Sequence, residues 1–474
     1  MTTATLIADQ DMTAALARML AATLRPGQVV LLDGPVGAGK THFARALIRA
    51  RQGDAAEDVP SPTFTLVQTY DDPMGSEIWH SDLYRLTDPS ELDELGLDEA
   101  LEHAICLIEW PDRLETLPEG ALMLSISPLP PDQDPNLRRI TLSGGAHEPQ
   151  RLVQRAEFVA KAGWGDALVL PLAGDASARR YFRLLRGQDS AVLMDDRGPG
   201  TRPFVAMTQW LRAHGFGAPR IFAQDQAAGL LLVQDLGDDL VAGVLARDPA
   251  LAPAIYGRIT DLLVDLHRLP LPDFLPALDG PALGEQAGLF AQWYPLACGF
   301  DPGPAAAIAP LITQLHAELA ADMVPVVTLR DFHAENLIWH GDAPLGLIDY
   351  QDAVSCHPAY DLVSVLQDAR RDVAPEIETA CIARYLSATG RDEDRFRAAY
   401  ALLGAQRNLR IMGIFARLCL RDGKPRYLDF MPRVWTCIAR NLTHPALAPL
   451  ALVVNDLPAP DARIIERIRS QCRP

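Results

Sequence analysis

Short apolar runs alternate with amphipathic stretches over residues 1–140. Six runs have the length and composition of strands: VVLLD, TFTLVQTY, SEIWHSDLY, AICLIEW, LMLSIS and RRITLS. Helices are predicted over 9–24 and 40–51, and this alternation is typical of an α/β domain in which helices cover a sheet. The polar segment Ser143–Gln150 contains Gly and Pro and marks a domain boundary, so we assign residues 1–145 to a first domain.

The pattern changes after this boundary. A helix is predicted over 151–162, followed by antiparallel strands in LVLPLAG, RYFRLLRG, AVLMDD and GLLLVQDLG. From about residue 248 the chain is mainly helical, except for one strand pair formed by VVTLRDFHAENLIWH and APLGLIDYQDA. A small sheet lobe (151–240) followed by a helical lobe (241–474) predicts a bilobal, protein-kinase-like α+β domain.

Composition limits the class of protein. With 474 residues, 49% of them hydrophobic, the chain can form more than one packed core. The start MTTATLIADQD lacks a basic segment followed by an apolar one, and no apolar run approaches the ~18 residues of a membrane span. We therefore expect a cytoplasmic protein that does not enter a membrane. The seven cysteines are scattered without a Cys-x-x-Cys pair, which argues against a zinc site and a disulfide framework.

The net charge of −18 is unevenly distributed. Residues 1–149 carry 10 Lys and Arg against 24 Asp and Glu. An acidic domain repels a nucleic-acid backbone, so we expect no direct nucleic-acid binding, although a role in solubility explains the acidity equally well. Lysine occurs only at Lys40, Lys161 and Lys424, so phosphate chemistry elsewhere depends on arginine or metal.

An apolar strand leads into GPVGAGKT (34–41), which has the spacing of a phosphate-binding loop ahead of a helix. Glycines allow backbone N–H groups to surround phosphate oxygens, and the positive end of the following helix points at the same anion. Lys40 can reach the β- and γ-phosphates, and the Thr41 hydroxyl can bind Mg²⁺. The predicted nucleotide-binding residues of this loop are Gly34, Gly37, Ala38, Gly39, Lys40 and Thr41.

Three further features follow predicted strands of the first domain. Thr63 lies in the turn SPTF, Asp82 in HSDLYRL and Glu109 in CLIEW. Acids at the carboxyl ends of parallel strands beside a phosphate loop can bind Mg²⁺ directly or through water. A strand-end Asp is also typical of a helix cap, so these features gain their meaning from the loop. Arg138 or Arg139 could add charge near a nucleotide, but spacing does not place them.

The motifs GPVGAGKT, SPTFTLV, HSDLYRL and IEWPDR resemble the bacterial TsaE family, the ATPase of the threonylcarbamoyladenosine tRNA-modification system, over residues 1–145. The resemblance implies that the loop binds ATP, that Thr41 and Glu109 hold Mg²⁺, that Asp82 lies close to the metal or the attacking water, and that Thr63 senses the γ-phosphate. It also implies that partner proteins of this system, rather than the ATPase, transfer the threonylcarbamoyl group.

A second phosphoryl-transfer pattern lies in RDFHAEN. Asp331 and Asn336 have the spacing of a kinase catalytic loop, in which the Asp accepts a hydroxyl proton and the Asn binds Mg²⁺. Asp349 ends the apolar run GLID, where a carboxylate can bridge Mg²⁺ to the phosphates. D-x4-N is a common pattern and Asp349 could cap a turn, but pairing across a short hairpin favours a catalytic site. We expect Asp361 to brace the loop rather than contact substrate.

The small lobe offers candidates for nucleotide binding. The turn GDASARR, with Gly174 and Ser177, could cover the phosphates of ATP, and VQDLG around Gln234 resembles the hinge whose backbone holds adenine. The strand AVLMD lacks the phosphate-binding Lys that is usual in kinases. We hypothesise that Arg180 or Arg183 replaces it, because a guanidinium binds phosphate bidentately.

The acceptor site is less clear from the sequence. Trp293 and Tyr294 could stack on a sugar face, and they fit helix packing equally well. Arg407, Arg410 and Arg417 share one helical face and would suit a carboxylate, although such a stripe more often pairs with surface acids.

Residues 151–440 resemble the aminoglycoside phosphotransferase-like kinases, and GDASARRYFR, the LMD strand and QWYP look most like the AmgK-type anomeric kinases of N-acetylmuramate and N-acetylglucosamine. The resemblance implies that Asp331 is the catalytic base and that Asn336 and Asp349 hold Mg²⁺. The product would be a sugar 1-phosphate that feeds cell-wall recycling. The chain is thus predicted to be a bifunctional ATPase and amino-sugar kinase that uses ATP and Mg²⁺.

Other functions fit parts of the sequence. The first domain could be a nucleotide-gated regulatory module with little turnover. The missing Lys is compatible with a pseudokinase scaffold, although the intact Asp331, Asn336 and Asp349 argue against one. The acceptor could also be an aminoglycoside, choline or a homoserine-like metabolite.

Overall fold

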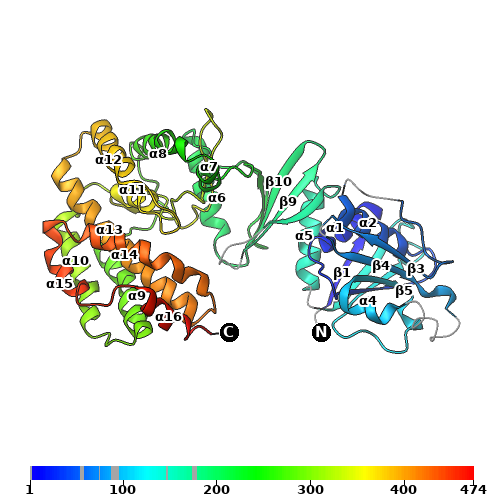
Figure 1. Ribbon diagram of the computed structural model, residues 1–474. Helices are drawn as coiled ribbons and strands as arrows, with labels where there is room; N and C mark the ends of the chain where they lie inside the picture. Colours follow the sequence, from blue (N-terminus) through cyan, green and yellow to red (C-terminus); the bar gives the residue numbers. More distant parts are fainter. Residues whose placement is uncertain are drawn as a thin grey trace. The chain divides into compact units, whose positions relative to one another are not determined.

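The chain divides into two compact units, one formed by residues 1–202 with 220–235 and the other by 203–219 with 236–474. The computed structural model describes residues 3–53, 58–73, 75–86, 96–145, 148–172 and 179–473. The predicted boundary at Ser143–Gln150 therefore lies inside the first unit, which joins the predicted first domain to most of the predicted small lobe (Figure 1).

A seven-stranded sheet forms the first part of this unit, with the strand order β1-β7-β6-β2-β5-β4-β3. Its strands are β1 (Thr3–Ala8), β2 (Val29–Asp33), β3 (Val67–Asp71), β4 (Glu77–Asp82), β5 (Ile105–Glu109), β6 (Leu122–Pro128) and β7 (Arg138–Gly144). Its helices are α1 (Gln10–Ala21), α2 (Lys40–Gln52) and α4 (Leu97–His103). Strand β2 is apolar because it pairs in parallel with β5 and β6 on either side.

The sequence analysis missed β1 and α4, and it began the strand TFTLVQTY, which corresponds to β3, four residues too early. The buried residues of β1 are Ala4, Leu6 and Ala8, so two of its three inward positions carry only a methyl group. Helix α4 has seven residues, too few to show a clear helical period. These weak signals explain why the apolar pattern did not reveal either element.

The same unit contains a five-stranded antiparallel sheet with the order β11-β12-β10-β9-β8. Its strands are β8 (Leu168–Leu172), β9 (Arg180–Arg186), β10 (Asp189–Asp195), β11 (Ile221–Asp225) and β12 (Leu230–Gln234). Helix α5 (Pro149–Lys161) precedes the sheet and contacts α1 and β1 of the first domain (Figure 1). The predicted strands of this lobe are present, whereas β11 was not predicted.

One apolar cluster extends through both sheets of the first unit. It includes Leu16 and Leu20 of α1, Leu152 of α5, and Leu184 and Leu193 of the second sheet, all of them buried. An ion pair also fastens α5 to β10, because Arg151 Nε and Arg155 Nε donate to the buried carboxylate of Asp195 at 2.9 and 2.5 Å. The predicted first domain and the small-lobe sheet therefore share a core rather than a flexible linker.

The second unit is mainly helical. Its helices are α6 (Thr201–Ala213, from Pro203 onward), α7 (Val241–Arg247), α8 (Ala252–Leu266), α9 (Gly280–Cys298), α10 (Ile308–Leu319), α11 (Ala359–Leu366), α12 (Pro375–Thr389), α13 (Glu393–Leu420), α14 (Met431–Asn441), α15 (Ala448–Val454) and α16 (Ala462–Arg469). The long helix α13 lies at the centre and contacts α9, α11 and α14 (Figure 1).

Two short antiparallel pairs replace the single strand pair predicted in this unit. Strand β13 (Val326–Thr328) pairs with β16 (Val354–Cys356), and β14 (Leu337–Ile338) pairs with β15 (Gly346–Leu347). The inner pair lies between the outer strands in sequence. The segments that carry Asp331 and Asp349 therefore run between paired strands rather than along them.

Cys419 of α13 and Cys472 near the C-terminus form a disulfide. The sequence-based argument against disulfides is wrong at this pair. The two cysteines are 53 residues apart, and no spacing rule shows that the segment after α16 returns to α13.

No single described helix is long and apolar enough to cross a bilayer. One bent pair, Pro425–Asn441 with Pro445–Val454, meets the length and composition criteria only when its two parts are taken together across a bend of 106°.

The shared core predicts that α5 stabilises the first domain. Leu152 is 1% exposed, so Leu152→Ala should lower the free energy of unfolding of the first unit by about 2–5 kcal/mol. Denaturant unfolding, followed by a fluorescent nucleotide at the phosphate-binding loop, measures this loss. Leu452→Ala is the control, because Leu452 is 74% exposed and should cost less than about 0.5 kcal/mol. Equal effects of the two substitutions would contradict a shared core.

Candidate functional sites

The phosphate-binding loop has the backbone that its glycines predict. Gly34, Gly37 and Gly39 have φ of 142°, 75° and 115°, in the region that favours glycine. A Cβ on Gly34 would lie 2.2 Å from the carbonyl oxygen of Ile126, so a side chain cannot fit there. Helix α2 begins at Lys40, directly after the loop, and its N-terminal N–H groups are therefore available to an anion.

Lys40 folds back over this loop. Its Nζ donates to the carbonyl oxygens of Gly34 at 2.6 Å and Pro35 at 3.1 Å, and it lies 3.6 Å from the centre of the Trp110 ring. Burial lowers the pKa of Lys40, while nearby carboxylates, Glu109 first among them, act in the opposite direction. Trp110 was not predicted as part of the site, because its position next to Lys40 depends on the turn after β5 with φ of 62°.

A buried carboxylate lies next to the loop. Glu109 at the end of β5 accepts hydrogen bonds from Thr41 Oγ1 at 2.8 and 3.1 Å, and its Oε1 lies 3.0 Å from Nε2 of buried His80. A hydroxyl and a carboxylate are oxygen ligands that Mg²⁺ prefers. Thr41 and Glu109, which the resemblance implies hold Mg²⁺, are therefore in contact, and His80 is a third member of this group that the sequence did not reveal.

Asp82 connects the turn that carries Ser61 and Thr63 to the cavity beside the phosphate-binding loop. Its Oδ2 accepts hydrogen bonds from Ser61 Oγ at 2.9 Å and Thr63 Oγ1 at 2.7 Å, and its Oδ1 accepts from the backbone N–H of Tyr84 at 3.1 Å. Asp82 thus caps the short 3-10 helix Leu83–Arg85 and also lines the cavity beside the loop, so the cap is confirmed and its role near metal or water stays a prediction.

These side chains line one cavity of about 360 Å³. Its walls include the loop residues Gly37, Ala38, Gly39, Lys40 and Thr41, together with Thr63, Asp82 and Glu109. Arg138 Nε donates to the carbonyl oxygen of Ala38 at 3.3 Å, which places this arginine, left open by spacing, on the loop. The structure therefore brings the predicted residues of the first site together.

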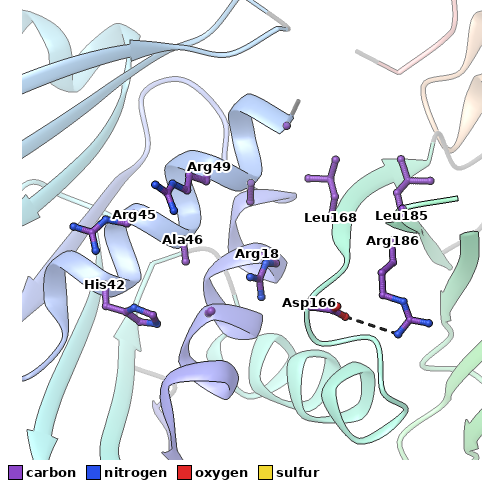
Figure 2. A pocket seen from close by; sticks show the side chains of 13 residues that line it. Arg18, His42, Arg45, Ala46, Arg49, Asp166, Leu168, Leu185 and Arg186 are labelled. Atoms are coloured by element: carbon purple, nitrogen blue, oxygen red, sulfur yellow. Dashed lines mark ion pairs between the residues drawn. The ribbon is translucent and has the colours of Figure 1, made fainter. Parts of the chain in front are cut away.

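A second cavity of about 430 Å³ lies along α2, from His42 to Gly53, where α1 and α2 meet the edge of the small-lobe sheet (Figure 2). Ala46, Leu168 and Leu185 contribute apolar walls, and Arg18, Arg45, Arg49 and Arg186 contribute charge. Arg186 lies 3.9 Å from Asp166, and Arg18 Nη1 donates to Gly165 O at 2.8 Å. The sequence did not predict this cavity, because it exists only where the two sheets are joined.

The small-lobe residues predicted to bind the nucleotide differ in how far their donors are already used within the protein. Arg183 is held by Asp235, with Nε 2.7 Å from Oδ2 and Nη2 3.2 Å from Oδ1. The Arg180 side chain is 58% exposed and lies 3.9 Å from Glu148. The backbone N–H of Gln234 donates to Arg220 O at 2.7 Å, so this donor serves the sheet rather than adenine.

Two further candidates, Gly174 and Ser177, lie outside the described residues. Strand β10 carries Asp195 in an ion pair with α5, and it has no lysine, as its sequence shows.

The second unit brings Asp331, Asn336 and Asp349 together. Asn336 Nδ2 donates to the carbonyl oxygen of Asp331 at 2.8 Å and lies 3.5 Å from Asp349 Oδ2. Gln351 Nε2 donates to Asp349 Oδ1 at 3.0 Å, and Asp349 has φ of 58° in a turn just after β15. In this arrangement the amide nitrogen of Asn336 faces both acids, so Asn336 would bind Mg²⁺ through its Oδ1 after the amide turns, with Asp349 as the carboxylate ligand. Asp331 lies half-buried on the same loop.

Asp361 braces this loop, as the sequence predicted. Its Oδ2 accepts the backbone N–H of Leu329 at 2.6 Å and its Oδ1 accepts that of Arg330 at 2.9 Å. Burial raises the pKa of Asp361 to about 7, whereas the two backbone donors and the charge of Arg407 act in the opposite direction. Arg330 has φ of 71°, so these two bonds hold a backbone conformation that L-residues rarely adopt.

Of the three acceptor candidates, Tyr294 is corrected by the structure. It is fully buried, stacks on Phe290 and Trp435, and donates its hydroxyl proton to Pro458 O at 2.8 Å. Its ring therefore packs the helical core and does not reach a sugar. Trp293 on the same helix is half-buried, and Arg407 is buried beside the catalytic loop.

Comparisons with known proteins match the two halves separately. A family model described as threonylcarbamoyl adenosine biosynthesis protein TsaE matches residues 7–134, and one described as the phosphotransferase enzyme family matches residues 169–399. The N-acetylmuramate/N-acetylglucosamine kinase of Caulobacter vibrioides is 40% identical over 346 residues, which cover 64% of this chain and 95% of that protein.

Two further relatives repeat this division. The protein of the same name from Pseudomonas aeruginosa is 36% identical over 321 residues, covering 64% of this chain and 92% of that protein. The tRNA threonylcarbamoyladenosine biosynthesis protein TsaE of Rickettsia bellii is 41% identical over 138 residues, covering 29% of this chain and 93% of that protein.

The hydrogen bonds of Asp361 predict the effect of removing one acceptor. Asp361→Asn places an amide where a carboxylate oxygen accepts a buried N–H, so the free energy of unfolding of the second unit should fall by about 1–3 kcal/mol. Chemical denaturation of the full chain measures this change. Asp265→Asn is the matched control, because the Asp265 side chain is 66% exposed. An unchanged unfolding midpoint for Asp361→Asn would show that the loop does not depend on this carboxylate.

Proposed function

We propose that this chain carries two independent ATP-dependent activities. The reason is that it belongs to the TsaE family in its N-terminal part and to the N-acetylmuramate/N-acetylglucosamine kinase family in its C-terminal part. The first site hydrolyses ATP in support of tRNA threonylcarbamoyladenosine formation. The second transfers the γ-phosphoryl group of ATP to an amino sugar. The observation that carries this proposal is that Lys40, Thr41 and Glu109 gather in the first unit and Asp331, Asn336 and Asp349 in the second.

At the first site, the loop and Lys40 would bind the phosphates of ATP. Thr41 and Glu109 would hold Mg²⁺, whose charge would stabilise the triphosphate. Asp82, held by Ser61 and Thr63, would orient the attacking water. The acidity of residues 1–149 supports a protein partner from the tRNA-modification system rather than direct contact with RNA.

At the second site, Asp331 would accept the proton of the acceptor hydroxyl while the hydroxyl oxygen attacks the γ-phosphorus. The bond from that phosphorus to the β,γ-bridging oxygen breaks, and ADP leaves. Asn336 and Asp349 would hold Mg²⁺. The relatives' name supports N-acetylmuramate and N-acetylglucosamine as acceptors. The resemblance of the sequence to anomeric kinases implies that the anomeric hydroxyl is the group phosphorylated.

Separate substitutions should separate the two activities. Asp331→Asn should lower the turnover of sugar phosphorylation by about 10²–10⁴-fold, because it removes the base, and leave ATP hydrolysis at the first site unchanged. Lys40→Ala should do the reverse. Phosphate release without sugar and sugar phosphate formation report the two reactions, and Asp273→Asn on an exposed loop is the control. Loss of both activities in either variant would contradict two independent sites.

A panel of acceptors tests the proposed substrate. The wild-type chain should phosphorylate N-acetylmuramate and N-acetylglucosamine in preference to an aminoglycoside, choline or homoserine, measured as ADP formed with ATP and Mg²⁺. Preference for any of the other acceptors would overturn the amino-sugar assignment and leave the kinase assignment intact.

Arg180 is our candidate for the missing lysine, because Arg183 already binds Asp235 while Arg180 is largely exposed. Arg180→Ala should raise the KM for ATP of sugar phosphorylation by about 10-fold, the cost of one charge-assisted contact. Arg186→Ala on the same strand is the control and should leave this KM unchanged. A rise only in Arg183→Ala would assign the role to Arg183.

A further inference from the structure

Arg407 is a buried cation without a partner among the described residues. It lies on α13, is 6% exposed, and its Nη1 makes no hydrogen bond. No ion pair joins it to any described carboxylate. An arginine keeps its charge under all ordinary conditions, so it cannot escape this situation by losing a proton. A buried unpaired charge is costly, and a site that retains one is typically completed by an anion.

Asp361 is a candidate for an internal partner of Arg407. Helix α13, which carries Arg407, packs against α11, which carries Asp361, and the positive charge of Arg407 acts on this carboxylate. Each oxygen of Asp361 accepts one backbone N–H, from Leu329 and Arg330. Within the described residues no hydrogen bond or ion pair joins Arg407 to Asp361, and Arg407 Nη1 is left without an acceptor.

Other buried polar atoms around the same loop also lack hydrogen-bond partners within the described chain. They are His333 Nδ1, Tyr360 Oη and Arg330 Nε, and the charge of Arg407 acts on both His333 and Tyr360. Arginine and tyrosine supply hydrogen-bond donors, and neutral histidine can do so with the correct tautomer. The unpartnered atoms of Arg330, Tyr360 and Arg407 are hydrogen-bond donors, which an anionic group can accept from.

Arg410 adds a second positive charge next to Arg407. It follows Arg407 by three residues on α13, so both side chains lie on the same face of the helix, and both act electrostatically on Tyr360. Arg410 is half-buried and has no described carboxylate as an ion-pair partner. Two guanidinium groups beside one loop suit a carboxylate, which accepts hydrogen bonds on both oxygens.

We infer that Arg407, supported by Arg410, binds a carboxylate of the acceptor sugar and so sets the preference between acceptors that carry a carboxylate and those that do not. This inference rests on the proposed function of the second site. N-acetylmuramate carries a lactyl carboxylate, and N-acetylglucosamine has the same ring without it. Arg407 is thus a specificity residue for the acceptor rather than part of the phosphoryl-transfer step.

The two acceptors provide the test. Arg407→Gln keeps hydrogen-bond donors and removes the charge, so it should raise the KM for N-acetylmuramate by about 10–100-fold, as expected for a lost charge-assisted contact. The KM for N-acetylglucosamine and the KM for ATP should change by less than about 2-fold. Arg417→Gln, nearly three turns further along α13 in the predicted stripe, is the matched control and should change none of these constants.

A modified substrate completes a double-mutant-type cycle between Arg407 and the substrate carboxylate. The amide of the N-acetylmuramate lactyl group should bind wild-type enzyme as weakly as the acid binds Arg407→Gln, and the two changes together should cost no more than either alone. Activity with N-acetylglucosamine also reports folding of the variant. Removing an unpaired buried charge is not expected to lower stability, which thermal unfolding checks.

Each contrary result has a separate meaning. An equal loss with both sugars would make Arg407 a structural support of Asp361 and overturn the inference. A rise in the KM for ATP would assign Arg407 to the nucleotide and also overturn it. If wild-type protein phosphorylates neither sugar, the proposed function itself fails, whereas two active sugars with no effect of Arg407→Gln refute this inference alone.

Discussion

Buried carboxylates that accept hydrogen bonds from their own chain hold both catalytic segments in place. In the second unit, Asp361 binds two successive backbone N–H groups and fixes the loop that carries Asp331. In the first, Glu109 binds the Thr41 hydroxyl and lies beside buried His80. Hydrogen-bond donors offset part of the cost of burying a carboxylate. The positions of Asp331 and Thr41 therefore depend on neighbouring acids that accept hydrogen bonds from the chain.

The boundary between folded units differs from the boundary between families. Family resemblance divides the chain near residue 145, but α5 and the sheet that follows it share an apolar cluster with α1. Arg151 and Arg155 add an ion pair to Asp195 within the same region. The strand that usually carries a kinase lysine here ends in an acid that binds this helix. The departure from the kinase pattern at β10 thus has a structural use in joining the two parts.

Local motifs could be predicted from the sequence, and long-range neighbours could not. The phosphate-binding loop, Asp331, Asn336 and Asp349 were found because each lies in a short pattern whose chemistry fixes its spacing. His80, Trp110 and the Cys419–Cys472 pair were missed because fold topology alone brings them to their partners. Tyr294 was misjudged for the opposite reason, since an aromatic residue in a helix gives no sign of whether it faces a ligand or the core.

The packing of α5 against α1 also determines the effect of a single proteolytic cut in the backbone. A protease that nicked the chain between β7 and α5 would break one peptide bond and leave the packed side chains of that interface untouched. The two fragments would then co-elute as one particle under native conditions and part only in denaturant. Covalent continuity ensures equal synthesis of the two halves, whereas their cohesion comes from the side chains packed between them.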